Sequence, residues 1–287
     1  MVSTLLSWLA AATNAPANVD LTEHALVQRF PLIAVVASLL FLAGIAADVY
    51  LLIRSLVIRF RGQVTPPSWG ITEVLVAAAI VFGASIPVGL LVTGFSLTGL
   101  LATELVLRTG MLVALVEFFR RRHIDWQQAF GLFRPSAAGS GLLIYLAALP
   151  PLFVTMFAYE RLLSWVGVKI STQPIAGMFV TTNSTAALIL LVLFALVIAP
   201  VFEEIVFRGF AYPALKARFG AGNALLIVSV FFALMHAHLP SAGPLFVLSL
   251  ALGFAYEYTG SIVTPITLHA VFNATNVATL FYVRANT

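Results

Sequence analysis

The chain contains no cysteine among its 287 residues and carries little charge. Without cysteine there is no disulfide framework and no thiolate to act as nucleophile or metal ligand. Only 9% of the residues are charged, against about 25% in soluble domains, and 61% are hydrophobic. This shortage of charge extends along the chain, which excludes an ordinary soluble domain and indicates a protein that crosses a membrane several times.

Long polar stretches are also missing, so no segment outside the apolar runs could bury a core of its own. A spanning helix needs about 20 mostly apolar residues. The sequence therefore predicts an all-α, polytopic transmembrane helical bundle of about eight spans. The expected spans cover residues 30–57, 70–94, 98–119, 140–164, 183–207, 222–238, 244–258 and 262–283.

The basic residues favour one side of the membrane. If the eight spans alternate, nine Lys and Arg residues fall on one side and four on the other, which predicts that the nine face the cytoplasm. No Lys/Arg run has the aromatic interleaving of a nucleic-acid site, so membrane lipids are the expected partners and nucleic acid is not. The segment "EFFRRRHIDWQQAFGLF" (117–133) predicts an interfacial helix among anionic headgroups, with a substrate-docking surface as the less favoured alternative.

Ionisable residues inside apolar runs are costly and therefore mark candidate functional sites. In "APVFEEIVFRGF" (199–210), Glu204 and Arg208 are four residues apart and can pair on one helix face. Glu203 points about 100° away from Glu204 and has no evident partner on its own helix. A desolvated carboxylate of this kind suits a general acid or base. Earlier in the chain, Glu104 and Arg108 share the same spacing, and a buried structural pair is the favoured interpretation there.

Two further polar clusters follow on the next spans. Glu203 precedes Phe219 by 16 residues and His236 follows Gly222 by 14, so both would lie about 20–25 Å from a turn near 218–223. An antiparallel helix pair would then bring Glu203 and His236 to a similar depth. His269 and Asn273 are four residues apart and share one helix face.

These three clusters resemble the motifs of the CAAX prenyl endopeptidase family, also called the CPBP intramembrane proteases. The family's "EExxxR", "FxxxH" and "HxxxN" correspond in order to Glu203–Arg208, Phe232–His236 and His269–Asn273. The resemblance covers about residues 180–283. It implies that water activated inside the membrane hydrolyses a peptide bond, with Glu203 as base and His236 assisting. It also implies that His269 and Asn273 stabilise the oxyanion, and that Glu204 and Arg208 support the site.

The resemblance also implies how the chain is divided. It implies variable transmembrane helices over 30–180 and the catalytic transmembrane core over 181–287, in the last four spans. From its own apolar run, the N-terminal segment 1–29 is expected to hold an interfacial helix, with a signal peptide as the open alternative. The substrate is expected to be a peptide or protein, lipidated or otherwise membrane-associated, approached from the cytoplasmic side. The composition favours a bacterial cytoplasmic membrane as the location.

Several alternatives stay open at this point. A zinc site could use Glu203, His236 and His269 as ligands and Glu204 as base, although the helical "HExxH" signature is absent. The metal-free Glu/His mechanism, without a cofactor, is preferred because Asn is a good oxyanion donor and a poor zinc ligand. The other classes of function are a non-enzymatic immunity or peptide-binding membrane protein and, less favoured, a proton-coupled transporter.

Overall fold

The fold is built from helices alone in the part of the chain that the structure describes. The computed structural model describes residues 31–57, 62–65, 67–80, 97–132, 134, 136–171 and 173–286. No strand occurs within these ranges, and the prediction of an all-α helical bundle is confirmed. The N-terminal segment 1–29, with its expected interfacial helix, lies outside the described residues.

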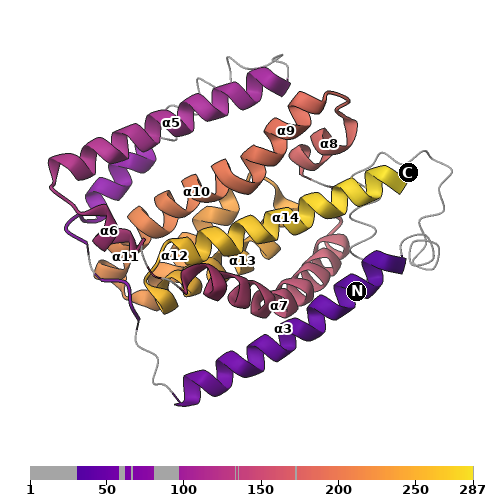
Figure 1. Ribbon diagram of the computed structural model, residues 1–287, viewed down its shortest axis with the longest axis horizontal. Coiled ribbons are helices and arrows are strands. Elements are labelled where there is room, and N and C mark those ends of the chain that lie inside the picture. The colour runs from indigo at the N-terminus through magenta and orange to yellow at the C-terminus, as the bar shows by residue number, and fades with distance from the viewer. Residues whose placement is uncertain are drawn as a thin grey trace.

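The helices form an elongated bundle with two outer helices and a central group (Figure 1). α3 runs along one edge and packs against α7, whereas α5 lies along the opposite edge and contacts α9. Between them lie the long helical run that contains α10 and, on the side of that run away from α5, α12, α13 and α14. The α-helices and their bounds are α3 (Pro31–Val57), α5 (Leu97–Arg121), α6 (Trp126–Phe130), α7 (Ala137–Trp165), α8 (Pro174–Thr181), α9 (Thr185–Leu193), α10 (Ala199–Glu204), α11 (Tyr212–Phe219), α12 (Ala221–Met235), α13 (Leu239–Thr259) and α14 (Val263–Asn286).

Four of the described helices are long and apolar enough to cross a membrane by length and composition. They are Val35–Ile53, Ala137–Trp165, Thr185–Phe219 and Leu239–Thr259. The expected number of eight is therefore not confirmed, although each expected span coincides with helix over its described residues. α12 is only 15 residues long, and α5 contains the charged residues Glu104, Arg108 and Glu117.

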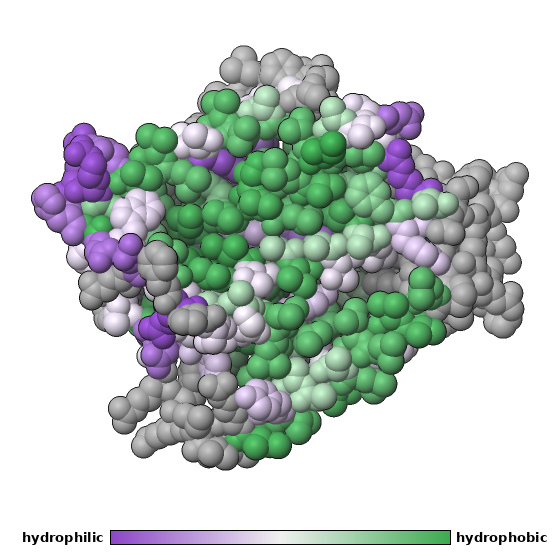
Figure 2. All heavy atoms as spheres, viewed as in Figure 1, coloured by the Kyte–Doolittle hydropathy of each residue, from purple (hydrophilic) through white to green (hydrophobic). Residues whose placement is uncertain are grey.

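The surface agrees with a location inside a lipid bilayer. Figure 2 shows a face that is mostly hydrophobic across its middle, with hydrophilic residues gathered towards the ends. Large apolar side chains such as Leu39, Val106 and Leu234 are more than 60% exposed. A soluble monomer rarely exposes so much contiguous apolar surface. The chain is therefore an integral membrane protein.

The long helix Thr185–Phe219 contains two π-helical segments, η1 (Phe194–Ile198) and η2 (Ile205–Ala211), on either side of α10. A proline follows closely after each of them, Pro200 after η1 and Pro213 after η2. Proline has no N–H, and its ring collides with the carbonyl four residues earlier in a regular α-helix. A wider π turn relieves that collision, so these prolines give the helix its irregular shape without ending it.

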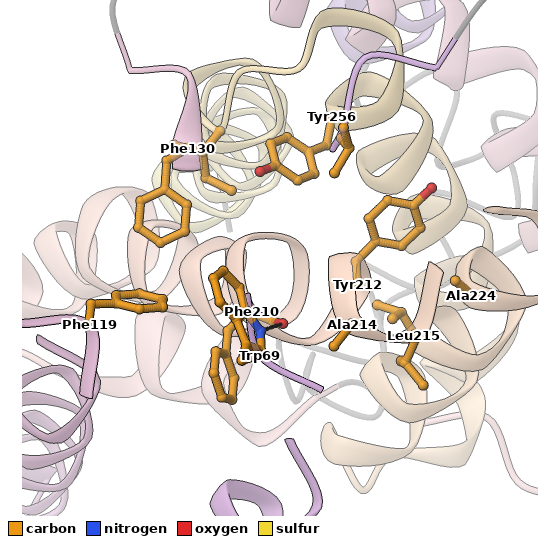
Figure 3. Close-up of a cluster of buried hydrophobic side chains, with 12 residues drawn as sticks. Trp69, Phe119, Phe130, Phe210, Tyr212, Ala214, Leu215, Ala224 and Tyr256 are labelled. Atoms are coloured by element: carbon orange, nitrogen blue, oxygen red, sulfur yellow. Dashed lines mark hydrogen bonds between the residues drawn. The ribbon is translucent and has the colours of Figure 1, made fainter. Parts of the chain in front are cut away.

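Residues 117–133 do not form one continuous helix, so that part of the prediction is wrong, whereas their position at the membrane interface stays a prediction. α5 ends at Arg121, and the short α6 begins at Trp126 after a turn. Phe119 and Phe130 are almost completely buried, and the cluster in Figure 3 packs them with Trp69 and Phe210. Trp69 also donates a 2.9 Å hydrogen bond from Nε1 to the Phe210 carbonyl. The aromatic rings of this segment therefore contribute to a packed cluster and do not line one face of a surface helix.

Two glycines of α7 provide a matched test of helix packing. A Cβ atom on Gly141 would lie 2.6 Å from the Thr264 carbonyl oxygen of α14, whereas one on Gly139 would meet nothing within 4 Å. Gly141→Ala should therefore lower stability by about 1–3 kcal/mol, because α7 and α14 would have to separate. Gly139→Ala should be neutral or raise stability by up to about 1 kcal/mol. Thermal unfolding in detergent measures both, and equal melting temperatures for the two variants would contradict the packing described here.

Candidate active site

A buried ion pair lies at the centre of the site. Arg208 Nη1 donates a 2.9 Å hydrogen bond to Glu204 Oε1, and both side chains are completely buried. The two residues are one helical turn apart, as their spacing predicts. Arg208 Nη2 also donates to the carbonyl and the hydroxyl of Ser249, at 3.0 and 2.7 Å. The ion pair thus attaches the helix that contains α10 to α13.

Ser249 is a site residue that the sequence analysis missed. It is a small polar residue inside the apolar run of α13, and the residue is 1% exposed. Such a serine commonly bonds within its own helix, so its sequence context gives no signal for a contact with Arg208. An unexplained polar residue on a buried helix face is the only signal that could have been used.

His269 connects Glu204 with Glu203. Its Nδ1 lies 2.9 Å from Glu204 Oε1, and its Nε2 lies 3.9 Å from Glu203 Oε2. An ionised carboxylate only accepts hydrogen bonds, so Nδ1 carries the proton that faces Glu204. In the neutral ring Nε2 is then the nitrogen with the lone pair, and it faces Glu203. The separation of 3.9 Å exceeds a direct hydrogen bond and is one at which a water can contact both groups.

Phe232 brings the second motif to the same place. Its ring is completely buried and lies 4.8 Å from the His236 ring and 5.9 Å from the His269 ring. Arg208 Cζ lies 4.8 Å from the centroid of the same phenyl ring. The resemblance singles out this phenylalanine, and the structure shows it in contact with residues of all three motifs.

His236 has the same tautomer as His269. Its Nδ1 lies 2.8 Å from the Phe232 carbonyl oxygen. Since a carbonyl oxygen can only accept, Nδ1 donates and Nε2 of the neutral ring carries the lone pair. Among the described contacts, no hydrogen bond or ion pair joins His236 to Glu203. The direct neighbour of Glu203 from the later motifs is therefore His269, although the arithmetic of the helix pair pointed to His236.

Asn273 fills a gap that the π turn leaves in the backbone. The Ala199 N–H bonds to the Phe194 carbonyl, five residues earlier, so it is not available to Ala195. The residue five positions after Ala195 is Pro200, which has no N–H to donate. Asn273 Nδ2 supplies the missing donor at 2.8 Å from the Ala195 carbonyl oxygen. One N–H of its amide is thus engaged, and the amide has one more.

Glu203 has no partner among the described contacts on its own helix, as expected, but it has one on another helix. Arg108 of α5 reaches across to it, with Nη1 3.3 Å from Glu203 Oε1. Arg108 also pairs with Glu104, as expected, but Glu104 is half exposed, so the expectation of a buried structural pair is wrong. Helical periodicity could not predict the contact between Arg108 and Glu203, because these two residues are 95 positions apart in the sequence.

A metal ion at this site would need several His, Asp or Glu side chains close together. No group of three His, Asp or Glu side chains among the described residues is arranged to hold a metal. Glu203, His236 and His269, the alternative zinc ligands, are all described, and the hydrogen bonds of the two histidines at Nδ1 leave both Nε2 atoms available. The zinc alternative stays a prediction.

No curated protein shows significant similarity to the chain, and neither does any solved structure. A family model does match, over residues 185–275, which contain all three motifs. The family is described as type II CAAX prenyl endopeptidase, Rce1-like. This confirms the resemblance over those residues, which are similar to the Rce1-like type II CAAX prenyl endopeptidase family, a family of peptidases.

Proposed function

We propose that the protein is an intramembrane endopeptidase that uses Glu203 as its general base. The observation that carries the proposal is the position of His269 between the two glutamates. Its Nε2 lies 3.9 Å from Glu203, and its Nδ1 contacts Glu204 of the buried Glu204–Arg208 ion pair. A carboxylate and an imidazole whose lone pairs face each other across this distance can hold a water molecule, and the carboxylate can deprotonate it. The family match over residues 185–275 supports peptide hydrolysis as the reaction.

The proposed reaction begins with one water molecule held by Glu203. Glu203 removes a proton from this water, and the oxygen attacks the carbonyl carbon of the scissile bond. The water donates its second hydrogen bond to His269 Nε2. His236, at the end of α12, keeps the assisting role that the resemblance implies and does not take part in this hydrogen bond. The lone pairs of Glu203 and His269 orient the water before the attack.

The attack produces a tetrahedral oxyanion that needs donors. The second N–H of Asn273 supplies one, because the first is held by the Ala195 carbonyl. His269 supplies another only after it takes a proton at Nε2, which the nearby Glu203 can transfer. The same proton finally goes to the leaving amine nitrogen as the C–N bond breaks, which yields a carboxylic acid and an amine.

The roles of the surrounding residues follow from their burial. Glu204 and Arg208 hold His269 in one tautomer and have no direct part in the reaction. The substrate is proposed to be a membrane-associated peptide or protein that approaches from the cytoplasmic side, in a bacterial membrane. The mechanism proposed here uses no metal and no cofactor.

Cleavage by the purified protein tests this function. The protein in proteoliposomes should cut a tagged peptide that spans or anchors to the bilayer, and a chelator that removes zinc should leave the rate unchanged within about twofold. A rate lost with the chelator and restored by added zinc would replace the proposed mechanism with the metal-dependent one. Proton flux without any cleavage would favour a transporter, and peptide binding without cleavage a non-enzymatic protein.

A further inference from the structure

We propose that Arg108 is a positioning residue for Glu203, so that α5, outside the matched residues 185–275, completes the active site. This inference rests on the proposed function, because it assigns Arg108 a role through the proposed base. Neither the motifs nor the family match assigns any residue of α5.

The first support is the contact itself. Arg108 Nη1 lies 3.3 Å from Glu203 Oε1, and the two side chains are only 19% and 14% exposed. An ion pair with this little solvent is screened much less than a surface pair. The opposite oxygen, Oε2, is the one that faces His269. Arg108 therefore holds one carboxylate oxygen and leaves the other directed towards the site.

The second support is the way in which Arg108 is held. Its Cζ atom lies 5.1 Å from the centroid of the Phe194 ring and 4.8 Å from that of Phe202. Both rings belong to the helix that contains Glu203, one in η1 and one in α10. A guanidinium is attracted to the faces of aromatic rings and is restricted by them, which fixes the direction of its donors.

The third support is the balance of charge around Glu203. Arg208, the other buried cation of the site, already pairs with Glu204. Among the described ion pairs, Arg108 is therefore the guanidinium that contacts Glu203 directly, and without it the carboxylate would be free to turn towards other donors.

The packing of α5 allows it to deliver this side chain. Leu101, two helical turns before Arg108, packs against the buried cluster of Phe179, Leu191 and Val277. The contact joins α5 to α9, which continues into the helix that contains Glu203, and to α14, which carries His269 and Asn273. α5 is thus attached at a defined position relative to Glu203.

Steady-state kinetics with three variants test the role. Arg108→Gln should lower kcat by about 10²-fold with KM unchanged within about threefold, because the base is misplaced while substrate binding is kept. Arg108→Lys should recover most of kcat, since it keeps the cation. The matched control is Arg121→Gln on the same helix, which removes a 76% exposed arginine and should keep the activity of the unmodified protein. An unchanged kcat in Arg108→Gln, or a loss that Lys does not rescue, would overturn the role.

A thermal double-mutant cycle separates this inference from the proposed function. The losses in melting temperature for Arg108→Gln and Glu203→Gln should not add up in the double variant, because each removes the same ion pair. Additive losses would show that Arg108 does not hold Glu203. If the unmodified protein cleaves no peptide, the proposed function fails, and the cycle still decides whether the Arg108–Glu203 contact exists.

Discussion

Replacing Glu203 with glutamine is expected to reduce peptide cleavage by about 10²- to 10⁴-fold, the range that a general base contributes. Glutamine has nearly the same shape, and its amide oxygen can still accept a hydrogen bond from Arg108. What it loses is the ability to take a proton from water. The measurement is kcat on a tagged membrane peptide, after correction for the amount of folded protein.

The matched control for this variant is Glu117→Gln, which changes a partly exposed glutamate near the end of α5. It should cleave the peptide at the rate of the unmodified protein. Equal and substantial activity in Glu203→Gln and Glu117→Gln would rule out Glu203 as the base. A non-enzymatic role would then be the better interpretation, because the fold and the buried ion pair would be intact.

The second large effect is expected on stability, from Arg208→Met. Methionine fills much of the same space but leaves Glu204 buried without its cation. Removing one partner of a buried ion pair costs about 3–5 kcal/mol, a large part of the 5–15 kcal/mol that stabilises a typical protein. A marked fall in the melting temperature and in the yield of folded protein is therefore expected.

Two comparisons make that result specific. Arg121→Met removes the arginine of an exposed pair and should cost no more than about 1 kcal/mol. The double variant Glu204→Gln/Arg208→Met should be more stable than Arg208→Met alone, because no unpaired buried charge remains. A melting temperature for Arg208→Met equal to that of Arg121→Met would contradict the buried ion pair.

Local features of this molecule could be predicted from the sequence and distant contacts could not. The Glu204–Arg208 pair follows from a spacing of four residues, and the helices follow from apolar runs. The turn expected near 218–223 occurs at Gly220, which has a positive φ of 80° between α11 and α12. Glycine adopts a positive φ without strain, so this turn could also be predicted from the local sequence.

The contacts that organise Glu203 required the three-dimensional structure. Arg108 and Ser249 come from helices whose positions no periodicity specifies. The count of eight spans depended on apolar length alone, although α12 is short and α5 is interrupted by charge. The roles of His236, His269 and Asn273 in catalysis stay predictions.

The two π-helical segments change which residues share a face along the helix Thr185–Phe219. Each π turn contains an extra residue, and one residue corresponds to about 100° of rotation in an α-helix. A helical wheel drawn with a single period from Thr185 to Phe219 therefore loses phase at η1 and again at η2. A residue before Phe194 and a residue in α11 that share a face on such a wheel therefore do not share a face in the helix. Deleting one residue from η1 would restore the regular period and turn α9 by about 100° relative to Glu203.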